Sequence, residues 1–111
     1  RFATLVHPAA VVPRSACVGP GTVLLASVVV TTGLVIGAHV AVMPATVLTH
    51  DDVVGDYATF GAGAVVAGRV TIGEGAYIGA GALIRESRTG GDWALIGMGA
   101  VVAADVPPYE V

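Results

Sequence analysis

A large apolar residue recurs at every sixth position from Val6 to Val102, and no insertion breaks the phase. Of the 17 positions in this column, only Gly90 is not large and apolar. Glycine follows the column directly at eight positions, and a small or β-branched residue mostly stands two positions before it. A period of six fits neither the period of an amphipathic helix, about 3.6 residues, nor the alternation of a lone strand. The sequence therefore predicts one small structural unit that is repeated along the chain.

A short strand followed by a tight corner accounts for this period. In such a strand the apolar residue and the small residue two before it both point inward. The glycine supplies the positive φ or the close approach that a corner needs. Three such units close a triangular coil of about 18 residues. We therefore predict an all-β fold, a parallel β-helix forming one domain over residues 1–111. Its nearly six coils are 6–23, 24–41, 42–59, 60–77, 78–95 and 96–111.

Composition excludes several classes of protein. Hydrophobic residues make up 55% of the chain, yet no apolar run approaches the roughly 20 residues that cross a bilayer. The net charge is −3 and only five residues are Lys or Arg, which argues against a nucleic-acid partner. Cys17 is the single cysteine, which fits a reducing compartment, so we expect a cytoplasmic protein. Outward residues such as Val29, Val35 and Val47 would leave much apolar surface exposed, which predicts a homo-oligomer, and a trimer suits a three-sided column.

Three residues interrupt the inward-facing columns. Asp52 stands two positions before Val54, where a carboxylate must be paired, protonated or displaced by a local distortion. Arg88 and Gly90 interrupt the inward columns together, so we expect residues 85–92 to form a corner pushed out of register. We interpret both interruptions as structural irregularities rather than as functional sites.

Of the three histidines, His50 has the most suggestive surroundings. His7 precedes a proline and His39 lies in a corner, so we expect both to be surface or turn residues. His50 is followed by Asp51 and Asp52. A neighbouring carboxylate can hold a histidine in one tautomer and raise its basicity, as a general base requires. A solvated polar turn is the alternative, and a metal cluster is less favoured because adjacent residues rarely converge on one ion.

The stretch ATVLTHDDVVGDYATFGAGAVVAGRVTIGEGAYIGAGALI, followed by IGMGAVVAADVPP, resembles one branch of the left-handed β-helix hexapeptide-repeat acyltransferases. That branch comprises sialic-acid O-acetyltransferases and bacillosamine-type nucleotide-sugar N-acetyltransferases, and the resemblance covers essentially the whole chain. It implies a left-handed coil, acetyl-CoA as acyl donor and no metal. The implied acceptor is an amino or hydroxyl group of a sugar or nucleotide-sugar. The implied assembly is a homotrimer with active sites between its subunits.

The resemblance also implies roles for individual residues. His50 matches the catalytic base, and Asp51 matches the acidic residue that orients it. Gly68 and Ala80 match positions beside the pantetheine arm of the cofactor, and Met98 matches a further cofactor-side position. Thr59 stands where many members carry a second histidine that contacts the acetyl group. The expected cofactor-binding residues are therefore Thr59, Gly68, Ala80 and Met98.

Members of this branch usually carry an N-terminal Rossmann-like domain that binds the acceptor. We expect this chain to be the transferase domain of a longer protein, without that domain. Two other functions stay open at this point. One is a zinc enzyme like the γ-type carbonic anhydrases, which share the fold, although Ala45 stands where a ligand histidine would be needed. The other is a non-catalytic β-helix used for assembly or as a scaffold.

Overall fold

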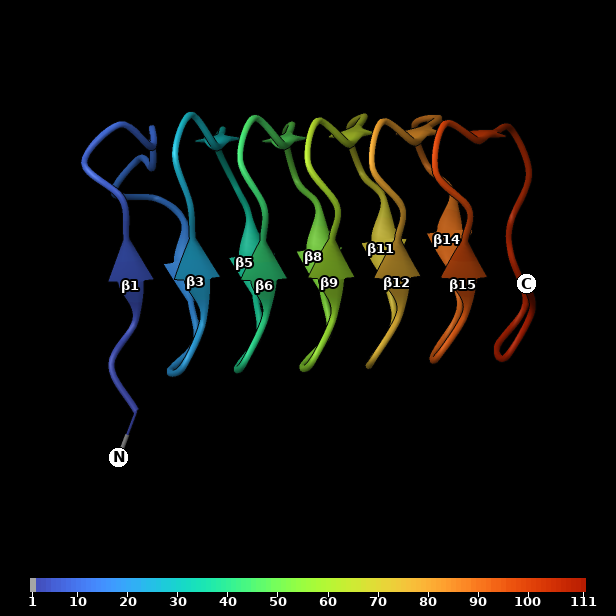
Figure 1. Cartoon of the computed structure of the whole chain (residues 1–111), viewed down its shortest axis with the longest axis horizontal. Coiled ribbons are helices and arrows are strands. Elements are labelled where there is room, and N and C mark those ends of the chain that lie inside the picture. Colours follow the sequence, from blue (N-terminus) through green and yellow to red (C-terminus); the bar gives the residue numbers. More distant parts are fainter. Residues whose placement is uncertain (1) are drawn as a thin grey trace.

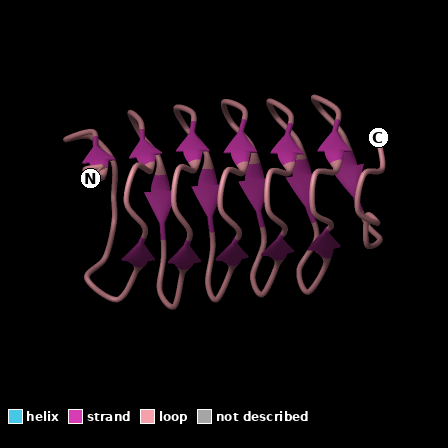
Figure 2. Ribbon diagram, turned by 90° about the horizontal axis from the view of Figure 1, so that it is seen from below, coloured by secondary structure: helices cyan, strands magenta, loops and turns pink. Residues whose placement is uncertain are grey.

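The computed structural model describes residues 2–111, which form a β-helix of two-residue strands without any helix (Figures 1 and 2). Residues 2–111 accordingly contain no helix that could cross a membrane. The strands are β1 (Leu5–Val6), β2 (Cys17–Val18), β3 (Val23–Leu24), β4 (Val29–Val30), β5 (Val35–Ile36), β6 (Ala41–Val42), β7 (Val47–Leu48), β8 (Val53–Val54), β9 (Thr59–Phe60), β10 (Val65–Val66), β11 (Thr71–Ile72), β12 (Tyr77–Ile78), β13 (Leu83–Ile84), β14 (Thr89–Gly90), β15 (Leu95–Ile96) and β16 (Val101–Val102).

These strands stack into three parallel sheets that form the sides of the prism. The first sheet has the order β1-β3-β6-β9-β12-β15, the second β16-β13-β10-β7-β4 and the third β14-β11-β8-β5-β2. Neighbouring strands within each sheet are offset by 18 residues, as Leu5 is from Val23 and Tyr77 from Leu95. The predicted all-β parallel β-helix and its 18-residue coil are confirmed. The left hand of the helix and the count of nearly six coils stay predictions.

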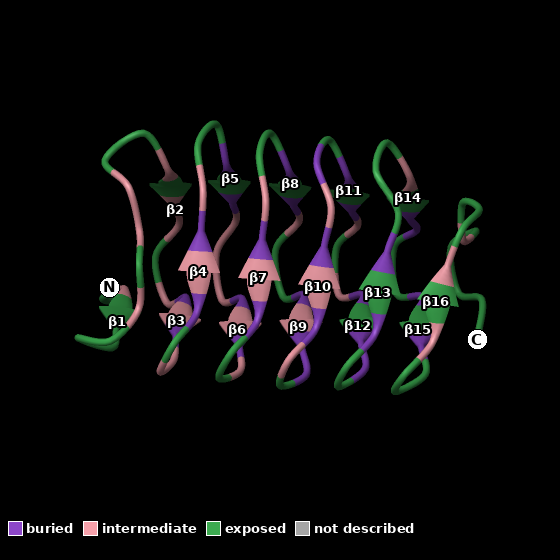
Figure 3. Cartoon of the chain, turned by 90° about the horizontal axis from the view of Figure 1, so that it is seen from above, coloured by how far each residue is buried: buried purple, intermediate pink, exposed green. Residues whose placement is uncertain are grey.

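The interior is the predicted six-residue column together with the small column two residues before it. Both columns are buried through the central coils (Figure 3). The largest fully buried side chains are Phe60, Leu24, Leu34, Leu48, Ile72, Ile78 and Ile84. Three polar residues lie fully buried among them: Thr22, Thr46 and Asp52.

The three corners of the prism differ in composition, and we name them accordingly. The His50 corner joins the second sheet to the third and comprises residues 49–52 with 31–34, 67–70 and 85–88. The aromatic corner joins the third sheet to the first and comprises residues 55–58 with 37–40, 73–76 and 91–94. The glycine-rich corner joins the first sheet to the second and comprises residues 61–64 with 43–46, 79–82 and 97–100.

Close approach, not positive φ, explains the glycines that follow the apolar column. A Cβ on Gly55 would lie 2.7 Å from the backbone nitrogen of Glu74 on the next coil. The positive φ falls two residues later, at the third position of each corner, on Gly63 at 71° and on Asp51 at 60°. Positive φ and close approach were the two roles predicted for these glycines. The structure supports close approach, because the missing Cβ leaves room for the backbone of the neighbouring coil.

Residues 85–92 stay in register, so the predicted displaced corner is wrong. Thr89 pairs with Thr71 and Gly90 with Ile72 at the regular offset. The ladder holds because the backbone hydrogen bonds do not depend on the side chains: Ser87 N–H donates to the carbonyl of Gly68 at 3.0 Å. A Cβ on Gly90 would lie 3.3 Å from Cδ1 of Ile72, so a neighbouring isoleucine closes over the missing side chain.

Candidate active site at the His50 corner

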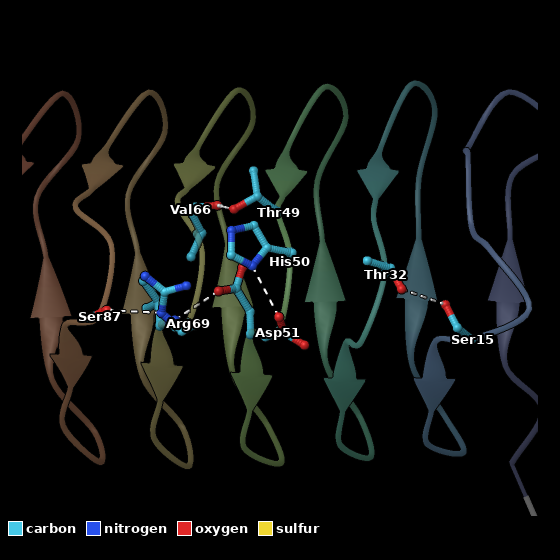
Figure 4. Close-up of polar contacts among 10 residues, drawn as sticks. Ser15, Thr32, Thr49, His50, Asp51, Val66, Arg69 and Ser87 are labelled. Carbon is cyan, nitrogen blue, oxygen red and sulfur yellow. Dashed lines mark hydrogen bonds and ion pairs between the residues drawn. The ribbon is translucent and has the colours of Figure 1, made fainter.

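His50 and Asp51 form an exposed pair just beyond the end of β7 (Figure 4). Nδ1 of His50 lies 3.1 Å from Oδ2 of Asp51, and the two side chains are 48% and 60% exposed. The corner is fixed to the next coil, because the His50 carbonyl accepts the N–H of Arg69 at 2.8 Å and Thr49 Oγ1 donates to the Val66 carbonyl at 2.9 Å. The pairing of His50 with a carboxylate therefore rests on a well-anchored backbone.

Bare backbone lies against both members of this pair. A Cβ on Gly68 would collide with Nε2 and the neighbouring carbons of the His50 ring. A Cβ on Gly33, one coil before the pair, would collide with Oδ1 of Asp51. Glycine on the flanking coils thus leaves the room that the two side chains occupy. The structure brings His50, Asp51 and Gly68 together, three of the six residues predicted for the site.

Asp52 points into the prism beneath this pair. Its side chain is 0% exposed, and Oδ1 accepts the N–H of Val70 at 2.8 Å. Burial raises the pKa of the Asp52 carboxyl to about 7, although the Val70 hydrogen bond and the nearby charge of His50 both lower it. Of the three outcomes predicted for a carboxylate here, the structure shows pairing of Oδ1 with a backbone N–H, and the corner keeps its register.

The other predicted cofactor residues lie away from His50 within one chain. Thr59 is half-buried on β9, in the first sheet. Ala80 and Met98 lie on successive coils of the glycine-rich corner, where Gly99 N–H donates to the Ala80 carbonyl at 2.8 Å and Met98 is 81% exposed. A strand of the second sheet separates this corner from the His50 corner. A single chain therefore does not unite the whole predicted set.

Arginines at the His50 corner were not among the residues predicted for the site. Arg69 lies one coil beyond His50, with Nε 3.4 Å from Ser87 Oγ, and Arg85 Nε lies 3.5 Å from Glu86 Oε1 (Figure 4 shows Arg69). Beside them is a largely apolar groove of about 300 Å³, lined by Ala67, Leu83, Ile84, Arg85, Glu86, Val101 and Ala103. The 18-residue spacing would have revealed this gathering, because it places Arg14, Arg69, Arg85 and Arg88 on one corner.

Residues 2–111 contain no group of three or more His, Cys, Asp or Glu side chains that could hold a metal ion. Ala45, where a zinc ligand would be needed, lies on the glycine-rich corner rather than beside His50. The geometry therefore offers nothing specific in favour of the zinc alternative.

Comparison with known proteins bears on the repeat and on the fold. The family model described as bacterial transferase hexapeptide (six repeats) matches residues 53–86. The chain carries the hexapeptide repeat of bacterial transferases. The resemblance to hexapeptide-repeat acyltransferases is thereby confirmed. No curated protein sequence matches the chain.

Solved structures of two bacterial proteins match almost the whole chain. The acetyltransferase domain of PglB from Neisseria gonorrhoeae, in complex with acetyl coenzyme A, is 37% identical with a TM-score of 0.94, covering 96% of this chain and 52% of that one. PerB from Caulobacter crescentus, in complex with CoA and GDP-perosamine, is 32% identical with a TM-score of 0.95, covering 96% and 52%. The chain thus spans about half the length of both.

A more distant structure shares the fold alone. LpxA from Acinetobacter baumannii is 19% identical to the chain, with a TM-score of 0.66, and the match covers 95% of this chain and 69% of that one. The chain therefore shares its fold with LpxA as well, while its identity to PglB and PerB is higher.

Proposed function

We propose that this chain is an acetyltransferase domain that moves the acetyl group of acetyl-CoA to an amino or hydroxyl group of a sugar or nucleotide-sugar. The observation that carries the proposal is the His50–Asp51 pair, 3.1 Å apart, with the His50 ring against the bare backbone of Gly68. The similarity to PglB and PerB, whose structures hold acetyl-CoA or CoA, supports the donor. The GDP-perosamine bound to PerB supports the acceptor class.

His50 would act as the general base through Nε2. With the ring proton on Nδ1 and donated to Asp51, the lone pair lies on Nε2. The acceptor nitrogen or oxygen forms a bond to the acetyl carbonyl carbon and gives up its proton to Nε2. The carbon–sulfur bond then breaks, and the proton passes from His50 to the departing sulfur, so CoA leaves as a thiol. Backbone N–H groups at the corner are the natural donors to the developing oxyanion.

The positions of Thr59, Ala80 and Met98 lead us to place the cofactor between two subunits. These residues lie apart from His50 in one chain, but in a cyclic trimer the His50 corner of one subunit can face the glycine-rich corner of the next. Small residues at 79–82 would let a narrow pantetheine arm lie close to the backbone. We infer that the trimer completes the site, with Met98 and Ala80 contributed by the neighbouring subunit.

The proposal predicts an acetyl transfer that depends on His50. The purified protein is incubated with acetyl-CoA and a panel of UDP- and GDP-linked amino sugars and sialic acid. Release of free thiol is followed. We expect His50→Ala to lower the acceptor-dependent rate by at least about 100-fold, the usual contribution of a general base. Equal rates in wild type and His50→Ala would refute the assignment of the base.

His39→Ala is the matched control for this experiment. His39 is also a corner histidine, but it lies on the aromatic corner and stacks on Tyr57 with ring centroids 5.3 Å apart. We expect the rate of His39→Ala to equal that of wild type. If both histidine variants lose the rate equally, the loss reflects folding rather than the chemistry of His50.

A further inference from the structure

Four ring-bearing side chains form a column along the aromatic corner and its continuation on the last coil. Each stands at the third position of its corner, where φ is positive: His39, Tyr57, Trp93 and Tyr109. The rings of His39 and Tyr57 are stacked, with centroids 5.3 Å apart. The Trp93 ring lies against the backbone of Gly75, because a Cβ on that glycine would collide with the ring. We call these four residues the aromatic column.

The fold itself does not favour large rings at these positions. The φ angle is 64° at Tyr57, 57° at Trp93 and 62° at Tyr109, in a region that glycine adopts freely and bulky residues seldom enter. The equivalent positions of the glycine-rich corner are Gly63, Gly81 and Gly99. The three rings are 54%, 50% and 75% exposed, so burial within this chain does not offset the strain. Strain that the chain keeps without burying the side chain points to a use of these rings outside the fold.

A column of carboxylates runs beside the rings. Asp56, Glu74 and Asp92 hold the second position of this corner on successive coils, about 4.8 Å apart along the prism. Asp92 Oδ1 accepts the N–H of Glu74 at 2.9 Å, and Asp56 Oδ1 accepts the N–H of Ala38 at 2.8 Å. Within residues 2–111 none of the three carboxylates forms an ion pair. Like charges at neighbouring positions of adjacent strands repel one another, so a positive charge from outside would stabilise this corner.

A hollow of about 440 Å³ adjoins the end of the carboxylate column. Asp92 and Asp105 are among the residues that line it, together with Pro107 and Pro108. Oδ1 of Asp105 accepts the N–H of Thr89 at 2.9 Å. None of the described residues that line the hollow is basic. Carboxylates beside an apolar wall suit a side chain that carries a cation on an apolar stem.

Arginine fits the rings, the carboxylates and the hollow together. Its guanidinium group is planar and stacks on aromatic faces, and its fork of N–H donors pairs with carboxylates. A lysine ammonium brings the same charge, but it is a compact, strongly hydrated group without the planar fork. A neutral sugar would bring no positive charge to the three stacked carboxylates. The combination therefore favours a peptide segment that contains arginine over the other two.

We propose that the aromatic corner is a docking surface for an arginine-bearing segment of a partner protein. Guanidinium groups of that segment stack on the rings of the aromatic column and pair with the carboxylates beside them. This inference goes beyond acetyl transfer and does not depend on it. The proposed trimer brings the His50 corner against the glycine-rich corner, so the aromatic corner stays open for a partner.

Binding of defined probes tests the proposal. The purified protein is titrated with hexa-arginine, hexa-lysine and maltohexaose at about 0.15 M salt, where long-range attraction to the net charge of −3 is largely screened. Trp93 is the single tryptophan, so its fluorescence reports on this surface, and calorimetry gives the affinity independently. We expect hexa-arginine to change the Trp93 emission and to bind at least about fivefold more tightly than hexa-lysine.

Two variants of the corner and one matched control locate the binding. Tyr57→Gly removes a ring at a φ that glycine prefers, and Asp92→Asn removes a charge but keeps an oxygen for the Glu74 N–H. Glu86→Gln also removes one exposed carboxylate, but on the His50 corner, where Glu86 is 56% exposed. We expect Tyr57→Gly and Asp92→Asn each to weaken hexa-arginine binding about threefold, and Glu86→Gln to bind like wild type.

Several outcomes would overturn the proposal. Equal affinities for hexa-arginine and hexa-lysine would show that net charge alone drives binding. Binding of maltohexaose in place of the arginine peptide, or no binding of hexa-arginine at millimolar concentration, would exclude this partner. If Tyr57→Gly loses the fold, Asp92→Asn and its control decide the result. A Tyr57→Gly protein that is less stable yet binds hexa-arginine like wild type would show that the ring serves the coil and not a partner.

Discussion

At the scale of single residues, the corners hold side chains in a backbone conformation that they rarely choose. The φ angle is 56° at His39, 64° at Tyr57, 57° at Trp93 and 60° at Asp51. Aspartate and histidine tolerate this left-handed region better than most residues, but large aromatic residues seldom enter it. The coil enforces it, because each corner is hydrogen-bonded to the corner before it: Tyr57 N–H donates to the Ala38 carbonyl at 3.0 Å. The backbone conformation of the site is therefore imposed by the repeating coils and not by the φ preferences of its own residues.

Asp52 gives the fold a defined dependence on pH. The pKa of its carboxyl is raised from 3.8 to about 7, so the folded state binds more protons than the unfolded state between these values. Stability from this group is present below about pH 4, falls as pH rises through the window, and levels off above about pH 7. We expect wild type to lose up to about 3 kcal/mol of unfolding free energy between pH 5 and pH 8.

Urea unfolding at one fixed protein concentration would measure this loss. Asp52→Thr should show a markedly flatter change between the two pH values and should be the more stable protein at pH 8. Other titrating groups are shared by the two proteins, so their contributions cancel in the comparison. Parallel pH dependences in wild type and variant would contradict the expected behaviour of this carboxyl.

Residue-level expectations from the sequence held where the six-residue phase decided them. The phase correctly placed Asp52 inside the prism and His50 at a corner, but it could not say that Oδ1 of Asp52 would find the Val70 N–H. It also could not foresee that Gly68 would lie against the His50 ring, because contacts between coils depend on side-chain rotamers. The prediction for residues 85–92 was wrong because it relied on the unusual side chains at Arg88 and Gly90. The register of the strands is set by the backbone hydrogen bonds instead.

At the scale of strands and corners, the glycines that admit the next coil are the most sensitive positions. A Cβ on Gly61 would collide with the backbone nitrogen of Ala80 on the following coil. Gly97 occupies the equivalent position, but a Cβ there would meet nothing within 4 Å. Neither glycine has a positive φ. The difference between them is therefore the presence of a packed neighbouring coil.

We expect Gly61→Ala to destabilise the fold by about 2 kcal/mol or more, because a rigid backbone must move to admit the methyl group. Gly97→Ala should change the stability by less than about 0.5 kcal/mol. Thermal unfolding followed by circular dichroism, at matched concentrations, would compare both with wild type. A similar loss in the two variants would show that flexibility of glycine, rather than contact between coils, sets their importance.

At the scale of the whole molecule, the 18-residue repeat places different types of side chain on the three corners of the prism. Arginines gather on the His50 corner, and Asp56, Glu74 and Asp92 stack on the aromatic corner. The glycine-rich corner carries no charge at residues 61–64, 79–82 or 97–100. The second sheet lies between the His50 and glycine-rich corners, and its outward residues are all aliphatic: Val29, Val47, Val65, Leu83 and Val101. We propose that this sheet faces the threefold axis of the proposed trimer.

Light scattering would test this arrangement, with an expected mass of about three times the 11.0 kDa chain. Leu83 is 44% exposed on the second sheet, and we expect Leu83→Glu to yield monomers, because three buried charges would meet near one axis. Thr89→Glu, on the outward face of the third sheet in the next strand, should stay trimeric. A wild-type mass of a single chain at micromolar concentration would contradict both the trimer and the shared site.

Because the offset between neighbouring strands is constant at 18 residues, the β-helix can be lengthened or shortened by whole coils. Every strand meets its neighbour at the same translation, so a deletion of one full coil away from His50 would shorten the rod and leave each remaining edge aligned. A deletion of one residue would instead shift the phase of all later strands, so that their inward-facing side chains would point outward and their outward-facing side chains inward. Evolution of such a chain is therefore expected to proceed by duplication and loss of entire turns, with the reactive edge kept in line.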